Sequence, residues 1–97
     1  MTVAFGHGNV VITRNCQNYL NSIKTSPLPY LYRHLEGDWG DVDKHDKLAN
    51  DEALKHGSRL FSVYRLNDRG DKLWIITDAE DDQGVRRVTT VMLPEDY

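Results

Sequence analysis

Residues 59–93 of the chain are RLFSVYRLNDRGDKLWIITDAEDDQGVRRVTTVML, and this stretch decides the fold. Three segments within it are rich in β-branched, aromatic and aliphatic residues, as strands are: Arg59–Leu66, Lys72–Thr77 and Arg87–Leu93. Short polar links join them, and each contains a glycine, as hairpin connections commonly do: Asn67–Asp71 and Asp78–Gly84. The stretch therefore predicts three consecutive strands in an antiparallel meander.

The residues before Arg59 predict helices and one further strand. Asn9–Arg14 is short and β-branched, which favours a strand that can join the sheet. Helices are predicted over Cys16–Ile23 with Asn15 as N-cap, over Pro29–Leu35, and over Val42–His56. We expect the helices to cover one face of the sheet. Residues 1–97 would then form a single α+β domain with three to four antiparallel strands and two to three helices.

The third predicted helix combines clear end signals with an uneven surface. Asp38 or Asp41 is placed to cap its start, and Gly57 is placed to end it. Apolar residues at helical spacing predict an inward stripe made of Val42, Ala49 and Ala53. Another flank, which we expect to present its acids to solvent, holds Asp43, Asp46 and Asn50.

Composition narrows the classes of protein to which the chain can belong. Ninety-seven residues, 39% of them hydrophobic, make one domain with a thin core. The single cysteine, Cys16, excludes an internal disulfide and fits a reducing compartment. No apolar run approaches the ~20 residues of a membrane span, so we expect a soluble, cytoplasmic protein. A net charge of −3 and a pI near 5.7 argue against a nucleic-acid binder, which normally carries a basic patch.

Negative charge is concentrated in two clusters. The first lies within residues 36–52, among which Lys44 and Lys47 are basic, and contains Glu36, Asp38, Asp41, Asp43, Asp46, Asp51 and Glu52. The second has no basic residue inside it and contains Asp78, Glu80, Asp81 and Asp82. Such spacing resembles duplex DNA, which carries about one negative charge per ~1.7 Å of axis. The pattern predicts a protein that occupies a DNA-binding groove; the alternative is a soluble domain whose acids solvate helix starts and turns.

The two tryptophans are interpreted differently. Trp74 lies in the middle of a predicted strand, so we expect it in the core. Trp39 lies in a turn bounded by Gly37 and Gly40, which makes it a candidate contact residue for a partner protein.

The acids, the histidines and the cysteine do not form the patterns that are typical of a catalytic or metal site. The register of a calcium loop is not followed by Asp41, Asp43 and Asp46. A break at Gly37–Gly40 prevents one helix from aligning the three evenly spaced histidines on a zinc ion, namely His34, His45 and His56. Cys16, at a helix start, is interpreted as a packing residue and not as a nucleophile. We therefore expect no catalytic residue, no cofactor and no metal.

Several short motifs of the chain occur in the order and spacing of one family: Arg33–His34, Gly37–Gly40, Asn50–Leu54, Gly57–Leu60, Leu73–Thr77, Thr89–Thr90 and Leu93–Tyr97. From Leu31 to the end, the chain resembles small proteins encoded on plasmids, integrated elements and prophages. Within that context it is similar to phage-borne anti-CRISPR proteins of the type I-F class. The resemblance implies a mimic of double-stranded DNA that binds the tail of the Csy surveillance complex, at its large and Cas5-type subunits. One departure is the acidic Asp78–Asp82, which is longer than the corresponding turn of related plasmid-borne chains.

The expected function is therefore inhibition by binding, without catalysis and without direct binding of nucleic acid, by a monomer in the cytoplasm of an infected bacterial host. The expected partner-binding residues are Glu36, Asp38, Trp39, Asp41, Asp43, Asp46, Asp78, Glu80, Asp81 and Asp82. Two alternatives stay open. One is a small metal-dependent nuclease of a mobile element, and the other is an antitoxin or chaperone-like partner of another element protein.

Overall fold

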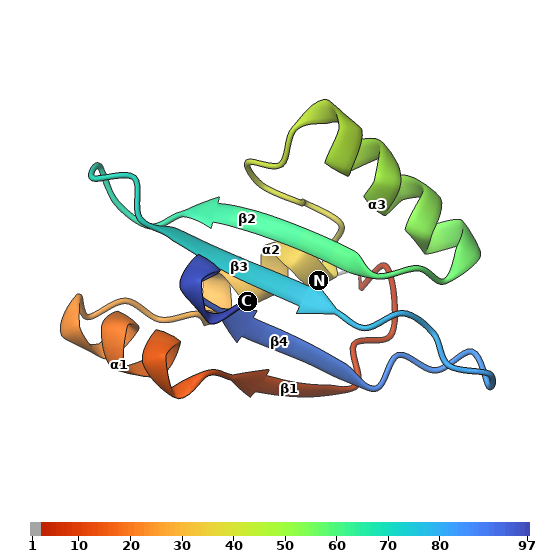
Figure 1. The fold of residues 1–97 in the computed structure, drawn as a ribbon, viewed down its shortest axis with the longest axis horizontal. Coiled ribbons are helices and arrows are strands. Elements are labelled where there is room, and N and C mark those ends of the chain that lie inside the picture. The colour runs from red at the N-terminus through yellow and green to blue at the C-terminus, as the bar shows by residue number, and fades with distance from the viewer. Residues whose placement is uncertain (1–2) are drawn as a thin grey trace.

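The computed structural model describes residues 3–97 and places them in three α-helices, a four-stranded sheet and a short 3-10 helix (Figure 1). In chain order the elements are β1 (Asn9–Ile12), α1 (Arg14–Ser22), α2 (Leu28–Leu35), α3 (Lys44–His56), β2 (Leu60–Arg65), β3 (Lys72–Thr77), β4 (Val88–Met92) and η1 (Pro94–Asp96). The predicted α+β class is confirmed. Over residues 3–97, no helix combines the length and the apolar character needed to cross a membrane.

The strands lie in the order β1-β4-β3-β2. β2 pairs antiparallel with β3, and β3 pairs antiparallel with β4, so the predicted meander is confirmed. β1 joins the sheet beside β4 but runs parallel to it, with Asn9 opposite Val88. The expectation that all strands are antiparallel is therefore wrong, and the sheet is mixed. Residues 13–87 supply the long crossover connection that a parallel pair requires.

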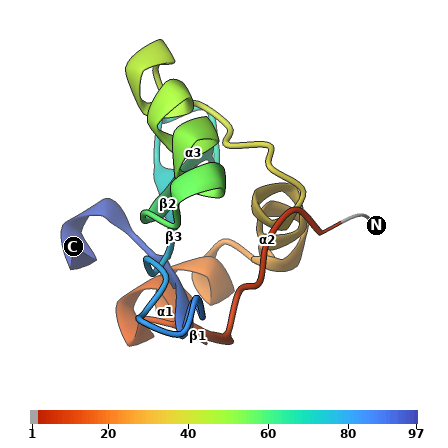
Figure 2. The same ribbon diagram turned by 90° about the vertical axis from the view of Figure 1, so that its right-hand side faces the viewer.

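One face of the sheet forms the main core with α1 and α2. The helices contribute Cys16, Leu20, Leu31 and Leu35, and the chain on the sheet side contributes Tyr64, Leu73, Ile75, Val91 and Leu93. Figure 2 shows α2 on one side of the sheet and the C-terminus on the other. The C-terminal side carries η1 and a group of aromatic rings in edge contact, Phe61, Trp74 and Tyr97. Trp74 is thus half-buried on the second face and does not belong to the main core.

α3 lies beside β2, at the edge of the sheet (Figure 1). The Asn50 amide donates to the Phe61 carbonyl at 2.6 Å and accepts from the Phe61 N–H at 3.0 Å. Next to it, the Val63 N–H donates to the Trp39 carbonyl at 3.1 Å, and the Asp41 N–H donates to the Val63 carbonyl at 2.7 Å. The outward backbone groups of Phe61 and Val63 are thereby satisfied, and this edge cannot pair with another strand there.

The inward face of α3 differs from the predicted apolar stripe. Ala53 is buried as expected, but Asn50 is buried too, whereas Ala49 is exposed and Leu48 is 65% exposed. Because α3 meets the strand edge through a side-chain amide, its buried face is partly polar. The spacing of apolar residues therefore does not identify the buried face of this helix.

Two helices begin with N-caps other than the predicted ones. Thr13 caps α1 in place of Asn15, and its hydroxyl accepts a hydrogen bond from the backbone N–H three residues later at 3.1 Å. Asp43 caps α3 in place of Asp38 or Asp41, in the same geometry at 2.8 Å. Each cap satisfies one of the free N–H groups of a helix start.

His34, on α2, is fully buried and belongs to a chain of hydrogen bonds that links α2 to β2, β3 and β4. The Thr89 hydroxyl donates to the His7 carbonyl at 2.7 Å, so it must accept from the Thr77 hydroxyl at 2.7 Å. Thr77 in turn accepts from Nε2–H of His34 at 2.8 Å, and Nδ1 of His34 accepts from the Ser62 hydroxyl at 2.6 Å. The chain fixes the neutral Nε2–H tautomer, and burial lowers the pKa of His34 to about 3.

Arg86 is a second buried polar group, with only 7% of its surface exposed. Its guanidinium donates to three backbone carbonyls: Ser58 at 2.6 Å, Asp78 at 2.9 Å and Ala53 at 3.0 Å. Ala53 lies near the end of α3, Ser58 lies just before β2, and Asp78 lies just after β3. One side chain therefore joins three segments, and burial lowers the pKa of Arg86 from its usual value.

Asp96, in η1, joins the C-terminal segment to the start of α1. Its carboxylate accepts from the Thr13 hydroxyl at 2.6 Å, the Asn15 amide at 2.9 Å and the Leu93 N–H at 3.0 Å. These bonds, led by that from Thr13, hold the pKa of Asp96 below its usual value. The C-terminal motif Leu93–Tyr97 thus has a structural role.

Candidate partner-binding surface

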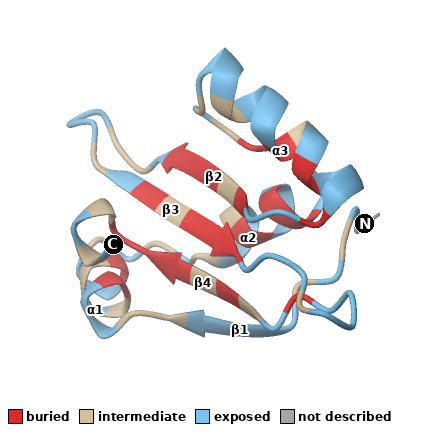
Figure 3. Cartoon of the chain, turned by 45° about the vertical axis from the view of Figure 1, so that its right-hand side comes forward, coloured by how far each residue is buried: buried red, intermediate tan, exposed pale blue. Residues whose placement is uncertain are grey.

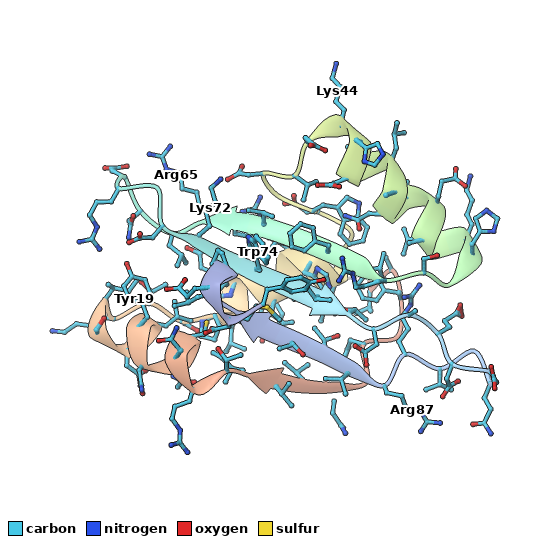
Figure 4. All side chains as sticks on the ribbon, viewed as in Figure 1. Tyr19, Lys44, Arg65, Lys72, Trp74 and Arg87 are labelled. Atoms are coloured by element: carbon cyan, nitrogen blue, oxygen red, sulfur yellow. The ribbon has the colours of Figure 1, made fainter. Side chains whose placement is uncertain are left out.

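The two acidic clusters lie at opposite ends of α3. The predicted contact acids of the first cluster lie in the α2–α3 loop and at the start of the helix, where Figure 4 labels Lys44, whereas its last two acids, Asp51 and Glu52, lie in the second half of the helix. The second lies in the β3–β4 loop, which contacts the other end of α3 because the Glu80 N–H donates to the Gly57 carbonyl at 2.7 Å. Gly57 ends α3, as predicted, with φ of 81°, and a Cβ there would overlap the Glu80 side chain. The fold thus places both clusters against the same helix, although they are separate in the sequence.

Three of the predicted contact acids already hold local structure. Asp38 accepts from Arg33 Nε at 2.7 Å, and this bond holds the pKa of the Asp38 carboxyl below its usual value. Asp81 accepts from the Val85 N–H at 3.0 Å, and this bond is the main cause of its lowered pKa. Asp43 is the N-cap of α3. All three contribute negative charge, but their oxygens have partners within the chain.

Five other acids are exposed, and no side-chain hydrogen bond or ion pair is found for them within residues 3–97. We call them the free acids: Glu36, Asp41, Asp78, Glu80 and Asp82. Asp46 belongs to neither group, because it is half-buried and its carboxylate lies 3.7 Å from Nδ1 of His45. The helix between the two groups carries basic residues as well, namely Lys44, Lys47 and Lys55. The negative charge therefore forms two patches and not a uniform line.

The prediction that Trp39 contacts a partner is contradicted by its burial. Trp39 is only 5% exposed, its ring stacks on Phe5, and its Nε1–H donates to Asp51 at 3.2 Å. The flanking glycines suggested an open turn, but the indole turns inward and helps to fasten α3. Exposed apolar side chains near the free acids and Asp46 in sequence are Tyr32, on α2, Leu48, on α3, and Val85, in the β3–β4 loop. Leu48 was not among the predicted contact residues, and its 65% exposure identifies it.

The same region contains one group of side chains whose donor atoms are close enough to hold a metal ion. Atoms of Asp43, His45 and Asp46 lie within 4.8 Å of one another. Asp43 and His45 are exposed, and the Asp43 carboxylate also caps α3. His34 lies in the core and takes no part in this group. Cys16 is also buried, and burial, with Asp96 and Glu95 nearby, raises the pKa of its thiol to about 11, so it is no activated nucleophile.

No protein-family model matches the chain, and the comparisons with curated proteins and with solved structures gave no match either.

Proposed function

We propose that the protein is a non-catalytic inhibitor that occupies the DNA-binding groove of a partner as a mimic of duplex DNA. The observation that supports this proposal most is the contact between Glu80 and Gly57, which places the second acidic cluster against α3. The partner that the sequence resemblance implies is the type I-F surveillance complex, at its large and Cas5-type subunits. The site of action would then be the cytoplasm of an infected bacterium.

The dimensions of the surface agree with such a role. α3 has 13 residues and is therefore about 20 Å long. Its ends carry the two patches of free acids, so that lysines and arginines spaced to hold successive DNA phosphates could meet carboxylates instead. Patches of one charge sign also attract an oppositely charged groove over distance and speed association. The same charge repels nucleic acid, so the proposed inhibitor does not bind DNA itself.

Charge alone does not give tight binding. Exposed ion pairs contribute about 0–1 kcal/mol each, so an inhibitor of this kind needs several pairs together with apolar anchors. Tyr32 and Leu48 are the side chains that we propose for this second role, because both are exposed, Tyr32 lies four residues before Glu36, and Leu48 lies two residues after Asp46. Trp39 is excluded from it by burial.

The first prediction concerns two free acids, one from each patch. Asp41→Lys combined with Asp82→Lys should weaken competition with target duplex for the type I-F complex by about tenfold or more, since reversal replaces attraction with repulsion at both patches. The measurement is the protein concentration that displaces half of a labelled duplex. A matched control, Asp68→Lys combined with Glu95→Lys, changes the net charge equally at exposed acids elsewhere. Equal losses in the two variants would show that only net charge matters, and no loss in the first would remove these patches from the interface.

The group formed by Asp43, His45 and Asp46 favours one competing function, a metal-dependent nuclease. Incubating the protein with single- and double-stranded DNA in Mg²⁺ or Mn²⁺, with and without EDTA, separates the two proposals. His45→Ala is the informative variant because this side chain is exposed and caps no helix. Cleavage that disappears both with EDTA and with this variant would overturn the binding-only proposal.

A further inference from the structure

The two edge strands of the sheet differ in what lies along them. The outer side of β2 is covered by Asn50 and by residues 39–41, as described above. β1 forms the opposite edge, and Figure 3 shows most of it exposed. Figure 1 shows no other strand beyond β1 in the part of the chain that the structure describes. Only one edge of this sheet is therefore open.

The open edge offers a regular set of backbone groups. The N–H groups of Asn9 and Thr13 donate to carbonyls of the β4 side at 3.0 Å, so the odd-numbered residues of β1 bond to β4. Alternation along a strand then turns the N–H and C=O groups of Val10 and Ile12 away from the sheet. Within residues 3–97, no backbone or side-chain hydrogen bond satisfies these four groups.

The side chains of β1 add nothing that would discourage pairing. The strand is Asn9-Val10-Val11-Ile12, without charge and without proline, although charged residues and proline are common protections of an edge. Val10 is 42% exposed and Val11 is 46% exposed. An apolar, uncharged edge of this kind is suited to accept another strand.

We propose that β1 pairs with β1 of a second copy of this chain, antiparallel and about a two-fold axis at Val11. In this register Val10 of each copy lies opposite Ile12 of the other, and the four outward groups of one strand meet the four of its mate. The two Val11 side chains then lie opposite each other in a non-hydrogen-bonded pair, where side chains come closest. The strand is self-complementary, as a two-fold interface requires.

The dimer would leave α3 and the start of the first acidic cluster uncovered. α3 lies beside β2, and the strand order places β2 at the edge farthest from β1. A sheet of eight strands would then carry one α3 at each outer end. This inference is independent of the proposed function, and it replaces the expectation of a monomer with a weak, concentration-dependent dimer.

Val11→Cys tests the register directly. In a non-hydrogen-bonded pair the two Cβ atoms lie about 4.5–5.5 Å apart, close to the separation in a disulfide, so mild oxidation should yield a covalent dimer on a non-reducing gel. Val3→Cys is the matched control, because Val3 is exposed to nearly the same extent, 45%, outside the strand. The natural thiol, Cys16, is buried. Cross-linking of Val11→Cys that does not exceed that of Val3→Cys would overturn the proposal.

Sedimentation of the unmodified chain over a range from micromolar to millimolar concentration tests the association itself. We expect reversible dimer formation that Val11→Lys abolishes, since two like charges would meet at the axis, and that Val3→Lys leaves unchanged. Circular dichroism verifies that both variants are folded. A chain that stays monomeric at millimolar concentration, or a Val11→Lys variant that still associates, would also overturn the proposal.

Discussion

Replacing Arg86 by methionine is expected to lower the free energy of unfolding by roughly 3 kcal/mol or more. Methionine fills much of the space but donates no hydrogen bond, so the carbonyls of Ala53, Ser58 and Asp78 lose their shared partner. An unsatisfied buried polar group costs about 1–3 kcal/mol. The carbonyls of Ser58 and Asp78 would be left without a partner, whereas the Ala53 carbonyl keeps its hydrogen bond from the Gly57 N–H at 2.8 Å. The guanidinium also lies near the carbonyl end of α3, where a cation is favourable.

Urea unfolding of the purified variants measures this loss. The neighbouring residue gives the control: Arg87 is exposed, and its ion pair with Asp81, at 2.7 Å, is of the surface type that contributes about 0–1 kcal/mol. Arg86→Lys should fall between the two, because an ammonium keeps the charge but cannot reproduce the planar arrangement of donors. If Arg86→Met and Arg87→Met destabilise the protein equally, the role assigned to Arg86 is wrong.

The second large effect is a loss of stability in mild acid caused by His34. Its folded-state pKa is about 3, below the ordinary value of 6.5, because burial disfavours the charged ring. Above pH 6.5 the ring is neutral in both states, and its contribution is fully present. As the pH falls below 6.5, His34 binds a proton in the unfolded chain but not in the folded protein. The free energy of unfolding therefore falls by up to about 1.4 kcal/mol per pH unit. The loss should continue until the pH approaches the folded-state pKa.

Measuring unfolding free energies between pH 6.5 and 4.5 isolates this group. The carboxylates with lowered pKa values, such as Asp96, lose their contributions only at lower pH. His34→Gln keeps an acceptor toward Ser62 and a donor toward Thr77 but does not titrate, so its stability should change less over this range. His45→Gln, at an exposed histidine, should keep the slope of the unmodified protein. A slope that persists unchanged in His34→Gln would contradict the assignment.

Features fixed by local sequence were predictable. Three β-rich segments with glycine-containing links are a local pattern, and Gly57 follows the last turn of α3 directly, so the meander and the end of this helix were found. The parallel placement of β1 was not, because nothing within Asn9–Ile12 indicates which distant strand will be its neighbour. The polar face of α3 was missed for a related reason, since the role of Asn50 depends on the edge of a strand that comes later in the chain.

The candidate surface shows the same division between local and distant information. The sequence located the two acidic clusters, but it could not show which acids have intramolecular partners. Asp81 accepts from its own loop, whereas Asp82, the next residue, is exposed. The Glu80–Gly57 contact likewise joins two segments through tertiary structure. Trp39 was assigned to the surface because its glycine neighbours give no information about the direction of the ring.

The parallel pairing of β1 with β4 has a consequence for the order in which contacts form. The two hairpins close across residues 66–71 and 78–87, whereas β1 reaches β4 only after residues 13–87 have been ordered between them. The entropy lost on closing a loop rises with its length, and contacts of high sequence separation slow folding. The meander can therefore form while β1 is still free, and β1 together with its anchor at Asp96 joins last. Without β1, the meander would expose an unpaired edge at β4, so the N-terminal strand protects that edge.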